Sequence, residues 1–461
     1  MATTSSASSQ SFDIELDIMG QQPGLLSIYT QISLVYPVSD PSQYPTIVST
    51  FEQGLSRLSK AFPWVAGQVK ADEGNPAVFK IVPYEETPRL VVKDLRDDSS
   101  APTIEGMRKA GFPIEMFDEN IIAPRKTLPI GPGTGPNDPK PVLLFQLNFI
   151  KGGLILTVNG QHGAMDMTGQ DAITHLLSKA CRNESFTEEE ISVMNLERKT
   201  LIPLLENYKL GPELDHQIAK PAPASEAPAG EAPPAPVKAS WVFFSFTPKA
   251  LSELKDVASK TLDASTKFVS TDDALSALIW KSVSRVRLAR VDASAPTEFC
   301  RAVDVRPQMG IPSTYPGILQ NMTYQDSTVS EIANEPLGAT ASRLRSQLDR
   351  ELLHKRTQAL VTYMHDTPDK SSISFTADAD PSTSIMLSSW AKVGCWGYDF
   401  GFGLGLPESV RRPRFEPFES LMYLMPKKPD GEFTAMLSLR DEDLERLKVD
   451  EEWTKYAQYI G

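Results

Sequence analysis

The stretch Asn159–Met167 carries the residues best suited to catalysis: His162 is followed four positions later by Asp166. Histidine suits a general base because its ordinary pKa of about 6.5 leaves it mostly neutral near pH 7. Such a base removes a hydroxyl proton, so that the oxygen attacks an acyl carbonyl. No cysteine lies in a recognisable nucleophile motif. We interpret His162 as the general base of an acyl transfer, a reaction for which no covalent acyl-enzyme is required.

Asp166 has two roles open to it from spacing alone. Its carboxylate would orient the imidazole, as the aspartate of a serine-hydrolase triad does. Alternatively it would pair with an arginine and fix the loop around His162.

A second histidine, His365, also has an aspartate four residues later, Asp369. Histidine is scarce, with five in 461 residues, so one of the two spacings is expected to be an accident. His365 lies in a polar stretch interrupted by Pro368, which predicts a turn. We interpret His162 as the functional copy because its surroundings are regular secondary structure.

Those surroundings predict a β-hairpin followed by a helix. Residues 142–150 and 154–158 are rich in branched and aromatic side chains, and Lys151-Gly152-Gly153 separates them as a turn. Residues 169–182 show helical periodicity, with Ile173, Leu176, Leu177 and Ala180 on one face. His162 therefore leaves a strand just before a helix, on a rigid support.

The totals exclude several classes of protein. A chain of 461 residues exceeds what one core usually serves, so two domains are expected. The net charge of −13 argues against nucleic-acid binding. The three cysteines (Cys181, Cys300, Cys395) form no metal spacing or disulfide framework, which predicts a reducing compartment. With no apolar run of membrane-spanning length and no signal peptide, we expect a cytoplasmic monomer without metal or membrane.

The chain divides at a segment rich in proline and alanine. Six prolines and six alanines occupy 221–236, which predicts an extended linker over 217–239 between halves 12–216 and 240–461. Residues 1–11 are predicted to be a disordered tail. Helices are predicted at 44–60, 248–259 and 441–460, and after the capping residue Ser270. Strands are predicted at 241–246, 298–305 and 386–393, with a hairpin over 419–439.

A glycine-rich loop at 130–136 has little in common with a phosphate-binding loop. It lacks the Gly-Lys-Ser/Thr ending and a following helix, and its prolines remove backbone donors.

Several motifs together resemble the BAHD acyltransferases, which use coenzyme A thioesters. They are His162-Gly163-Ala164-Met165-Asp166, the helix Ser270 to Trp280, Asp304-Val305-Arg306, Ser388-Ser389-Trp390 and Asp399-Phe400-Gly401-Phe402-Gly403. The last has phenylalanine where the family has tryptophan. Because the motifs occur in the family's order from about Phe12 onward, the combination is far more specific than any single one.

The resemblance implies a mixed α/β fold of two chloramphenicol-acetyltransferase-like domains with mixed sheets and a channel between them. Residues from about 399 to 424 would cross back and pack with 12–216. Within the family the chain is most similar to fungal members that acetylate the 3-hydroxyl of trichothecenes. Acetyl-CoA and a sesquiterpenoid alcohol are therefore the expected co-substrates.

The resemblance also assigns roles to residues. His162 would be the general base, and Asp166 would pair with Arg306. Asn321 would donate to the oxyanion. The coenzyme would be bound by Lys267, Ser270, Thr271, Ser388 and Ser389. Asp399, Gly401 and Gly403 would form a structural turn. Lys255, Lys260 and the Arg411-Arg412-Pro413-Arg414 cluster are weaker candidates for phosphate binding, and most of these charges are expected to be solvated.

Other classes fit less well. Peptide-forming condensation domains prefer a histidine and a glycine at the positions of Gln161 and Met167. A serine hydrolase would need a Gly-x-Ser-x-Gly elbow, and a kinase would need a His-Arg-Asp loop beside Asp399-Phe400-Gly401. A catalytically silent binding module with the same fold is a further alternative, against which an intact His162 argues.

Overall fold

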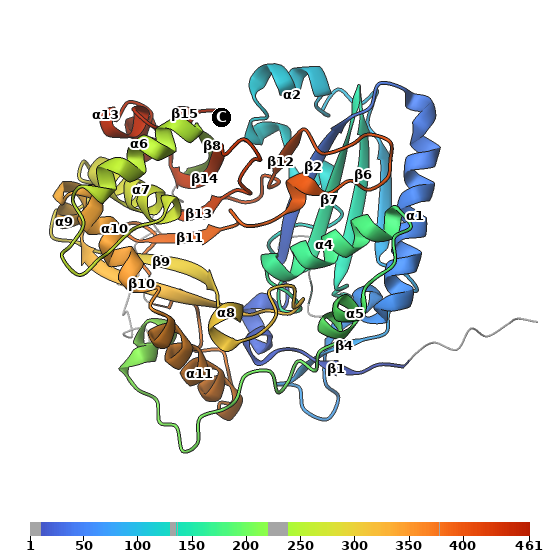
Figure 1. Ribbon diagram of the computed structural model, residues 1–461, viewed down its shortest axis with the longest axis horizontal. Coiled ribbons are helices and arrows are strands. Elements are labelled where there is room, and N and C mark those ends of the chain that lie inside the picture. The colour runs from blue at the N-terminus through green and yellow to red at the C-terminus, as the bar shows by residue number, and fades with distance from the viewer. Residues whose placement is uncertain (1–10, 130–134, 136, 220–237, 378) are drawn as a thin grey trace, which may run out of the picture.

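The computed structural model describes residues 11–129, 135, 137–219, 238–377 and 379–461, and these form a mixed α/β fold (Figure 1). Most of the predicted tail at 1–11, most of the glycine-rich loop at 130–136 and most of the predicted linker at 217–239 lie outside these residues. Sheets of five and seven strands stand side by side, and a small third sheet has three strands. The mixed α/β class predicted from the sequence is confirmed.

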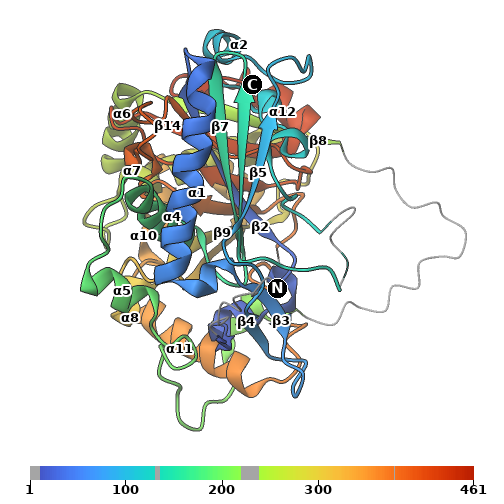
Figure 2. The same ribbon diagram turned by 90° about the vertical axis from the view of Figure 1, so that its right-hand side faces the viewer.

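The five-stranded sheet carries the His162 loop. Its order is β12-β2-β7-β6-β5, with β5 and β6 parallel and the other pairs antiparallel. The strands are β2 (Tyr29–Pro37), β5 (Arg89–Asp94), β6 (Leu143–Ile150), β7 (Gly153–Gln161) and β12 (Ser409–Arg411). The predicted hairpin is thus β6 and β7. Helices α1 (Tyr44–Ala61) and α4 (Met167–Cys181) pack against one face of this sheet (Figure 2).

The opposite face of that sheet is covered by α2 (Ile104–Ala110) and α3 (Glu119–Ile122). The alternation of the strands explains both cores, because Leu34 and Leu156 face α1 and α4 while Val35 and Ile155 face α2. The helix predicted from residue 169 begins two residues earlier, since Asp166 caps it.

The seven-stranded sheet belongs to the second half. Its order is β10-β9-β11-β13-β14-β8-β15, and β11 is parallel to both its neighbours. The strands are β8 (Ala239–Phe246), β9 (Pro296–Asp304), β10 (Gln320–Thr328), β11 (Ile385–Ser389), β13 (Leu421–Leu424), β14 (Phe433–Arg440) and β15 (Gln458–Tyr459). Its apolar face packs on helices that include α6 (Pro248–Ser259), α7 (Thr271–Arg287), α9 (Val329–Asn334) and α10 (Leu337–Ser346).

The remaining elements are a small sheet, further helices and short 3-10 turns. The small sheet consists of β1 (Ile14–Glu15), β3 (Gln68–Ala71) and β4 (Phe79–Val82). The other helices are α5 (Glu188–Met194), α8 (Arg306–Met309), α11 (Arg350–Asp366), α12 (Asp441–Leu447) and α13 (Glu451–Thr454). Short 3-10 turns include η6 (Pro212–Gln217) and η7 (Cys395–Gly397).

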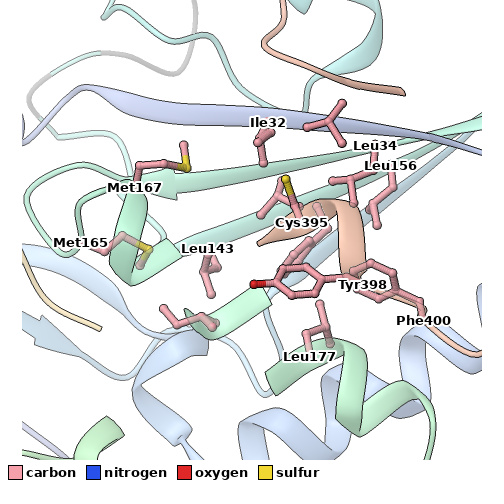
Figure 3. Close-up of a cluster of buried hydrophobic side chains, with 14 of the residues drawn as sticks. Ile32, Leu34, Leu143, Leu156, Met165, Met167, Leu177, Cys395, Tyr398 and Phe400 are labelled. Carbon is pink, nitrogen blue, oxygen red and sulfur yellow. The ribbon is translucent and has the colours of Figure 1, made fainter. Parts of the chain in front are cut away.

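The segment after β11 crosses to the first half. Cys395, Tyr398 and Phe400 lie in one buried cluster with Ile32, Leu34 and Leu156 of the five-stranded sheet and Leu177 of α4 (Figure 3). β12 then pairs with β2. The crossing ends earlier than predicted, because Leu421–Leu424 form β13 within the seven-stranded sheet.

The end of the first half also crosses, in the opposite direction. Figure 1 shows the chain after α5 running towards α11. Ile202 and Leu214 are buried together with residues of α11, and the backbone of Ala219 donates to the carbonyl of Ser372. A boundary at residue 216 is therefore too late for a packing unit, since residues from about 202 onward pack against the second half.

Three further predictions need correction. The closing helix at 441–460 is two short helices and a strand, because the chain breaks at Val449 and Asp450 caps a new turn. The strand at 386–393 ends at Ser389. His365 lies in the last turn of α11 rather than in a loop, and its exposed imidazole contacts the neighbouring Asp366.

The crossing segment provides a stability prediction. Phe400 is completely buried and its ring lies 6.0 Å from that of Phe51, so Phe400→Ala is expected to cost about 3–5 kcal/mol of unfolding free energy. Phe418 lies on the same segment but is 48% exposed, so Phe418→Ala is expected to change stability by about 0.5 kcal/mol or less. Chemical denaturation of both variants measures the difference. If the two variants were equally stable, burial of Phe400 would not be what holds the crossing segment against the first half.

Candidate active site

Hydrogen bonds of the backbone and of the Gln161 side chain fix the loop that carries His162. The backbone N–H of His162 donates to the carbonyl of Ile28 at 2.9 Å. The side chain of Gln161 donates to the carbonyls of Leu25 and Leu26 and accepts from the N–H of Ala164 at 2.8 Å. Because Gln161 is the last residue of β7 and α4 begins at Met167, the loop is fixed at both ends.

The imidazole is oriented by a main-chain carbonyl. Nδ1 lies 3.3 Å from the carbonyl oxygen of Met165, so it carries the proton and Nε2 is left as the acceptor. His162 is partly exposed as a residue, although it is not among the wall residues of the two cavities described below. Burial lowers the pKa of His162 below its ordinary value, although the Met165 carbonyl and Asp166 oppose the shift, and nearby Arg412 adds to it. His162 is therefore neutral near pH 7, as a base must be.

Asp166 pairs with Arg306 and not with His162. Both contacts of the bidentate pair measure 2.9 Å, and both residues are buried. The carboxylate also caps α4 through the N–H of Gly169 and accepts from the N–H of Leu319, each at 2.8 Å. The two roles left open by the sequence are thus distinguished: the contact with an arginine is present.

Arg306 completes this buried junction from the second half. Its guanidinium also contacts Asp304 at 2.9 Å and donates to the carbonyls of Tyr315 and Gly317. The pair therefore fastens the His162 loop to the start of α8 and to the 315–319 segment.

Two cavities lie where the halves meet, and they share no wall residue. The larger, of about 910 Å³, is walled by the first turns of α4, the start of α7, the end of β9 and residues 389–393. The smaller, of about 450 Å³, is walled by residues near α3, the start of β8 and residues 414–417. Both volumes fall in the range of small-molecule sites.

The larger cavity contains two of the five predicted coenzyme-binding residues. Ser270 and Ser389 lie on its wall, and the Ser389 hydroxyl donates to Asp272 at 2.5 Å. Thr271 and Ser388 are not among its wall residues, and Lys267 is exposed outside it. Its cations are instead Arg301, Arg345 and Lys392. No motif marks these three in the sequence, because they come from separate elements that only folding brings together.

The larger cavity also holds a perturbed carboxyl group. Asp171 accepts from the hydroxyl of Tyr398 at 2.7 Å and from the N–H of Gly394 at 2.9 Å. Burial raises the pKa of Asp171 to about 6 despite these hydrogen bonds. This contact joins α4 to the crossing segment at the cavity wall.

The smaller cavity combines aromatic and polar walls. Trp241 and Phe415 lie on it, with ring centroids 4.8 Å apart. Glu119 is buried there, and burial raises its pKa although it accepts from the N–H of Thr127 at 2.8 Å. Most of the wall residues are polar or charged, including Glu115, Asp118 and Arg414, so the aromatic pair is the main apolar surface that this cavity offers to an organic molecule.

The amide of Asn321 is engaged in structural contacts. It donates to the Thr357 hydroxyl at 3.1 Å and accepts from the Gln217 side chain at 3.0 Å. It lines neither cavity. Its assignment as oxyanion donor therefore stays a prediction without support from these contacts.

The Asp399 turn has the geometry that its glycines predicted. The Asp399 side chain accepts from the N–H of Gly401 at 2.8 Å, and Gly401 and Gly403 adopt φ values of +68° and +75°, which favour glycine. The Arg411–Arg414 cluster differs from expectation, because Arg411 and Arg412 are buried rather than solvated. Lys255 and Lys260 are exposed and line neither cavity.

A separate polar cluster lies on β9 and β10. His216 contacts Glu298 at 2.5 Å and Asp326 at 3.5 Å, and these are the three residues in the described part of the chain with metal-ligand spacing. They wall neither cavity, and they connect η6 to the sheet edge.

Comparison with known proteins agrees with this geometry. Residues 28–181 match the trichothecene 3-O-acetyltransferase-like N-terminal domain, and residues 132–454 match the transferase family. The chain belongs to the transferase family. This match confirms the resemblance to acyltransferases drawn from the motifs.

Within this family, the chain is similar to individual trichothecene 3-O-acetyltransferases. The chain is 83% identical to trichothecene 3-O-acetyltransferase TRI101 of Fusarium sporotrichioides, over the full length of both chains. It is 44% identical to the trichothecene 3-O-acetyltransferase of Saccharomyces cerevisiae, covering 97% of this chain and 96% of that one.

Solved structures share the fold. The crystal structure of F. graminearum TRI101 complexed with coenzyme A and T-2 mycotoxin has a TM-score of 0.93 and 74% identity, covering 98% of this chain and all of that one. Vinorine synthase, at 18% identity and a TM-score of 0.65, covers 99% of this chain and 96% of that one, and shares the fold alone. In the described residues no helix has the length and apolarity needed to cross a membrane.

The buried ion pair supports a stability prediction. Asp166→Asn removes the buried carboxylate that pairs with Arg306 and leaves only the partly exposed Asp304 beside the guanidinium, so a loss of about 3–5 kcal/mol is expected, seen as a lower denaturation midpoint. Asp304→Asn is the matched control, because Asp304 contacts the same guanidinium but its side chain is 36% exposed. It is expected to cost about 1 kcal/mol or less. An Asp166→Asn variant of full stability and slow turnover would instead assign Asp166 to the chemistry.

Proposed function

We propose that the protein transfers an acetyl group from acetyl-CoA to a secondary hydroxyl of a sesquiterpenoid, the 3-hydroxyl of trichothecenes. The observation that carries the proposal is the neutral imidazole of a partly exposed residue, with its Nε2 available, on a loop fixed between two halves that enclose separate cavities. The identity with TRI101 over the whole chain supports the substrates.

The reaction follows from the position of His162. Nε2 takes the proton of the acceptor hydroxyl as its oxygen attacks the thioester carbonyl carbon. The tetrahedral intermediate then collapses, the carbon–sulfur bond breaks, and the imidazolium returns the proton to the departing thiolate. His162 ends the cycle neutral, so both substrates react in one ternary complex.

The two cavities suit two co-substrates of different size. The larger is assigned to acetyl-CoA because its volume suits the bulkier co-substrate. The exposed Lys392 on its wall offers an ammonium group to phosphates, whereas Arg301 and Arg345 are already paired with Asp273. The smaller, with Trp241 and Phe415 on its wall, is assigned to the terpenoid alcohol. Each large sheet with its helices then forms one domain, and each substrate meets both domains.

The alternatives are a condensation-domain-like enzyme, an acyltransferase with another acceptor, and a silent binding module. Neutral, hydrogen-bonded His162 favours an enzyme over a binding module. The three free thiols, Cys181, Cys300 and Cys395, support the proposed cytoplasmic location.

Loss of the imidazole is the direct test. His162→Ala is expected to lower the rate of thiol release from acetyl-CoA and deoxynivalenol by about 10²–10⁴-fold, since a general base contributes that much. Free thiol and acetylated product are followed together. His365→Ala, at the exposed copy of the spacing, is the matched control and should retain wild-type turnover. Unchanged thiol release in His162→Ala would remove His162 from the mechanism.

The pH profile gives a second test. Because the pKa of His162 is lowered, its base form persists to more acidic pH than that of a free imidazole. The acid limb of kcat/KM is therefore expected to have its midpoint below about 6.5, with activity rising through that limb to a plateau near pH 7. A midpoint above 7 would contradict the environment described for the ring.

A further inference from the structure

Arg412 is a buried cation that the proposed chemistry leaves unused. It follows β12 directly and is 2% exposed. Its guanidinium carbon lies 4.4 Å from the ring centroid of Tyr423, 4.6 Å from that of Phe415 and 5.0 Å from that of Trp390. Three aromatic rings thus fix the position of the guanidinium without supplying an oxygen to it.

The hydrogen-bonding state of Arg412 differs from that of its neighbour. Arg411 is 3% exposed and donates to the carbonyls of Phe112, Val410 and Gly111. Arg412 makes no hydrogen bond within the described residues, and its Nε and Nη1 are fully sealed from solvent. Nη2 also lacks a hydrogen bond there but is not sealed. The guanidinium therefore presents one open edge.

Arg412 is not itself a wall residue of either cavity, but rings that stack on it belong to the walls of both. Phe415 is on the wall of the smaller cavity and Trp390 is on the wall of the larger. The cation is also near enough to His162 to lower its pKa, and near enough to interact with Glu119 of the smaller cavity. Residues 414–417, immediately after it in the chain, line the smaller cavity too. More of its neighbours thus belong to the cavity assigned to the alcohol.

We propose that Arg412 recognises the acceptor. Its Nη2 donates a hydrogen bond to an oxygen of the alcohol co-substrate other than the hydroxyl that reacts. The proposal rests on the proposed function. A guanidinium donates and never accepts, so it fits an ether, carbonyl or hydroxyl oxygen. Because a buried donor without a partner is costly, an alcohol that supplies this oxygen gains affinity over one that does not. Arg412 would make the site selective for polyoxygenated terpenoids.

The test separates binding from catalysis. Arg412→Met keeps the length of the side chain and removes its donors, and Arg412→Lys keeps the charge without the planar fork. With deoxynivalenol as acceptor, Arg412→Met is expected to raise the KM for the alcohol by about 10–100-fold. Its kcat and its KM for acetyl-CoA should stay within about twofold of wild type. The reason is that the lost hydrogen bond stabilises the bound alcohol and the transition state equally, so its loss raises only the KM for the alcohol. Arg412→Lys should recover part of the affinity.

A terpene alcohol with a single oxygen, such as menthol, sharpens the result. Wild type and Arg412→Met should turn it over with similar kcat/KM, because menthol offers no second oxygen to Nη2. Arg411→Met is the control for loss of a buried arginine, and it should lower thermal stability while leaving the KM for deoxynivalenol unchanged. Binding of coenzyme A by calorimetry confirms that each variant is folded.

Two outcomes would overturn the inference. A fall in kcat with unchanged KM for both acceptors would place Arg412 at the developing oxyanion, and equal kinetics of wild type and variants would remove it from the site. These results are distinct from failure of the proposed function. If wild-type protein transferred no acetyl group to deoxynivalenol, the proposed function would fail and this inference with it. If the wild type were active and Arg412→Met had an unchanged KM for deoxynivalenol, this inference alone would be contradicted.

Discussion

The buried pair of Asp166 and Arg306 is the contact on which the site depends. It joins a loop of the first half to the start of α8 in the second, and the same carboxylate caps α4 and holds the N–H of Leu319. Two charges removed from water are stable together only if each is fully hydrogen-bonded. The carboxylate and guanidinium meet this condition, so the position of His162 is coupled to the seating of one half against the other.

Two adjacent residues of the His162 loop, Met165 and Asp166, make different contacts and have different structural roles. Met165, through its carbonyl, sets the tautomer of the imidazole, whereas Asp166 serves the interface. The resemblance to a hydrolase triad is therefore only one of spacing. An imidazole held by a neutral carbonyl is less basic than one held by a carboxylate, which suits the role proposed for His162, to take a proton and then return it to a thiolate.

Much of this arrangement was predictable from the sequence. The β6–β7 hairpin, helices α1, α6 and α7, and the position of His162 between strand and helix follow from local periodicity and capping. The partnership of Asp166 with Arg306 followed from family motifs, since no local pattern links residues 140 positions apart. The cavity cations Arg345 and Lys392 were missed for the same reason.

The sequence-based predictions were wrong where tertiary packing determines the local structure or the burial of a side chain. The chain around Val449 has helical composition, yet Asp450 starts a new capped turn there and β15 then pairs with β8. The Arg411–Arg412 pair looks like a surface cluster in sequence, but its stacking on Phe243, Trp390, Phe415 and Tyr423 buries it. Aromatic partners from distant segments are invisible to a local reading of charge.

The pairing of β12 with β2 also governs the order of assembly. During synthesis, β2 emerges early, but the strand that covers its edge lies some 370 residues later, at Ser409–Arg411. Until then the nascent first sheet exposes an unpaired edge, the kind of surface that recruits other strands and promotes aggregation. The first sheet therefore cannot be completed until much of the second half has been synthesised, so neither lobe can be finished independently of the other.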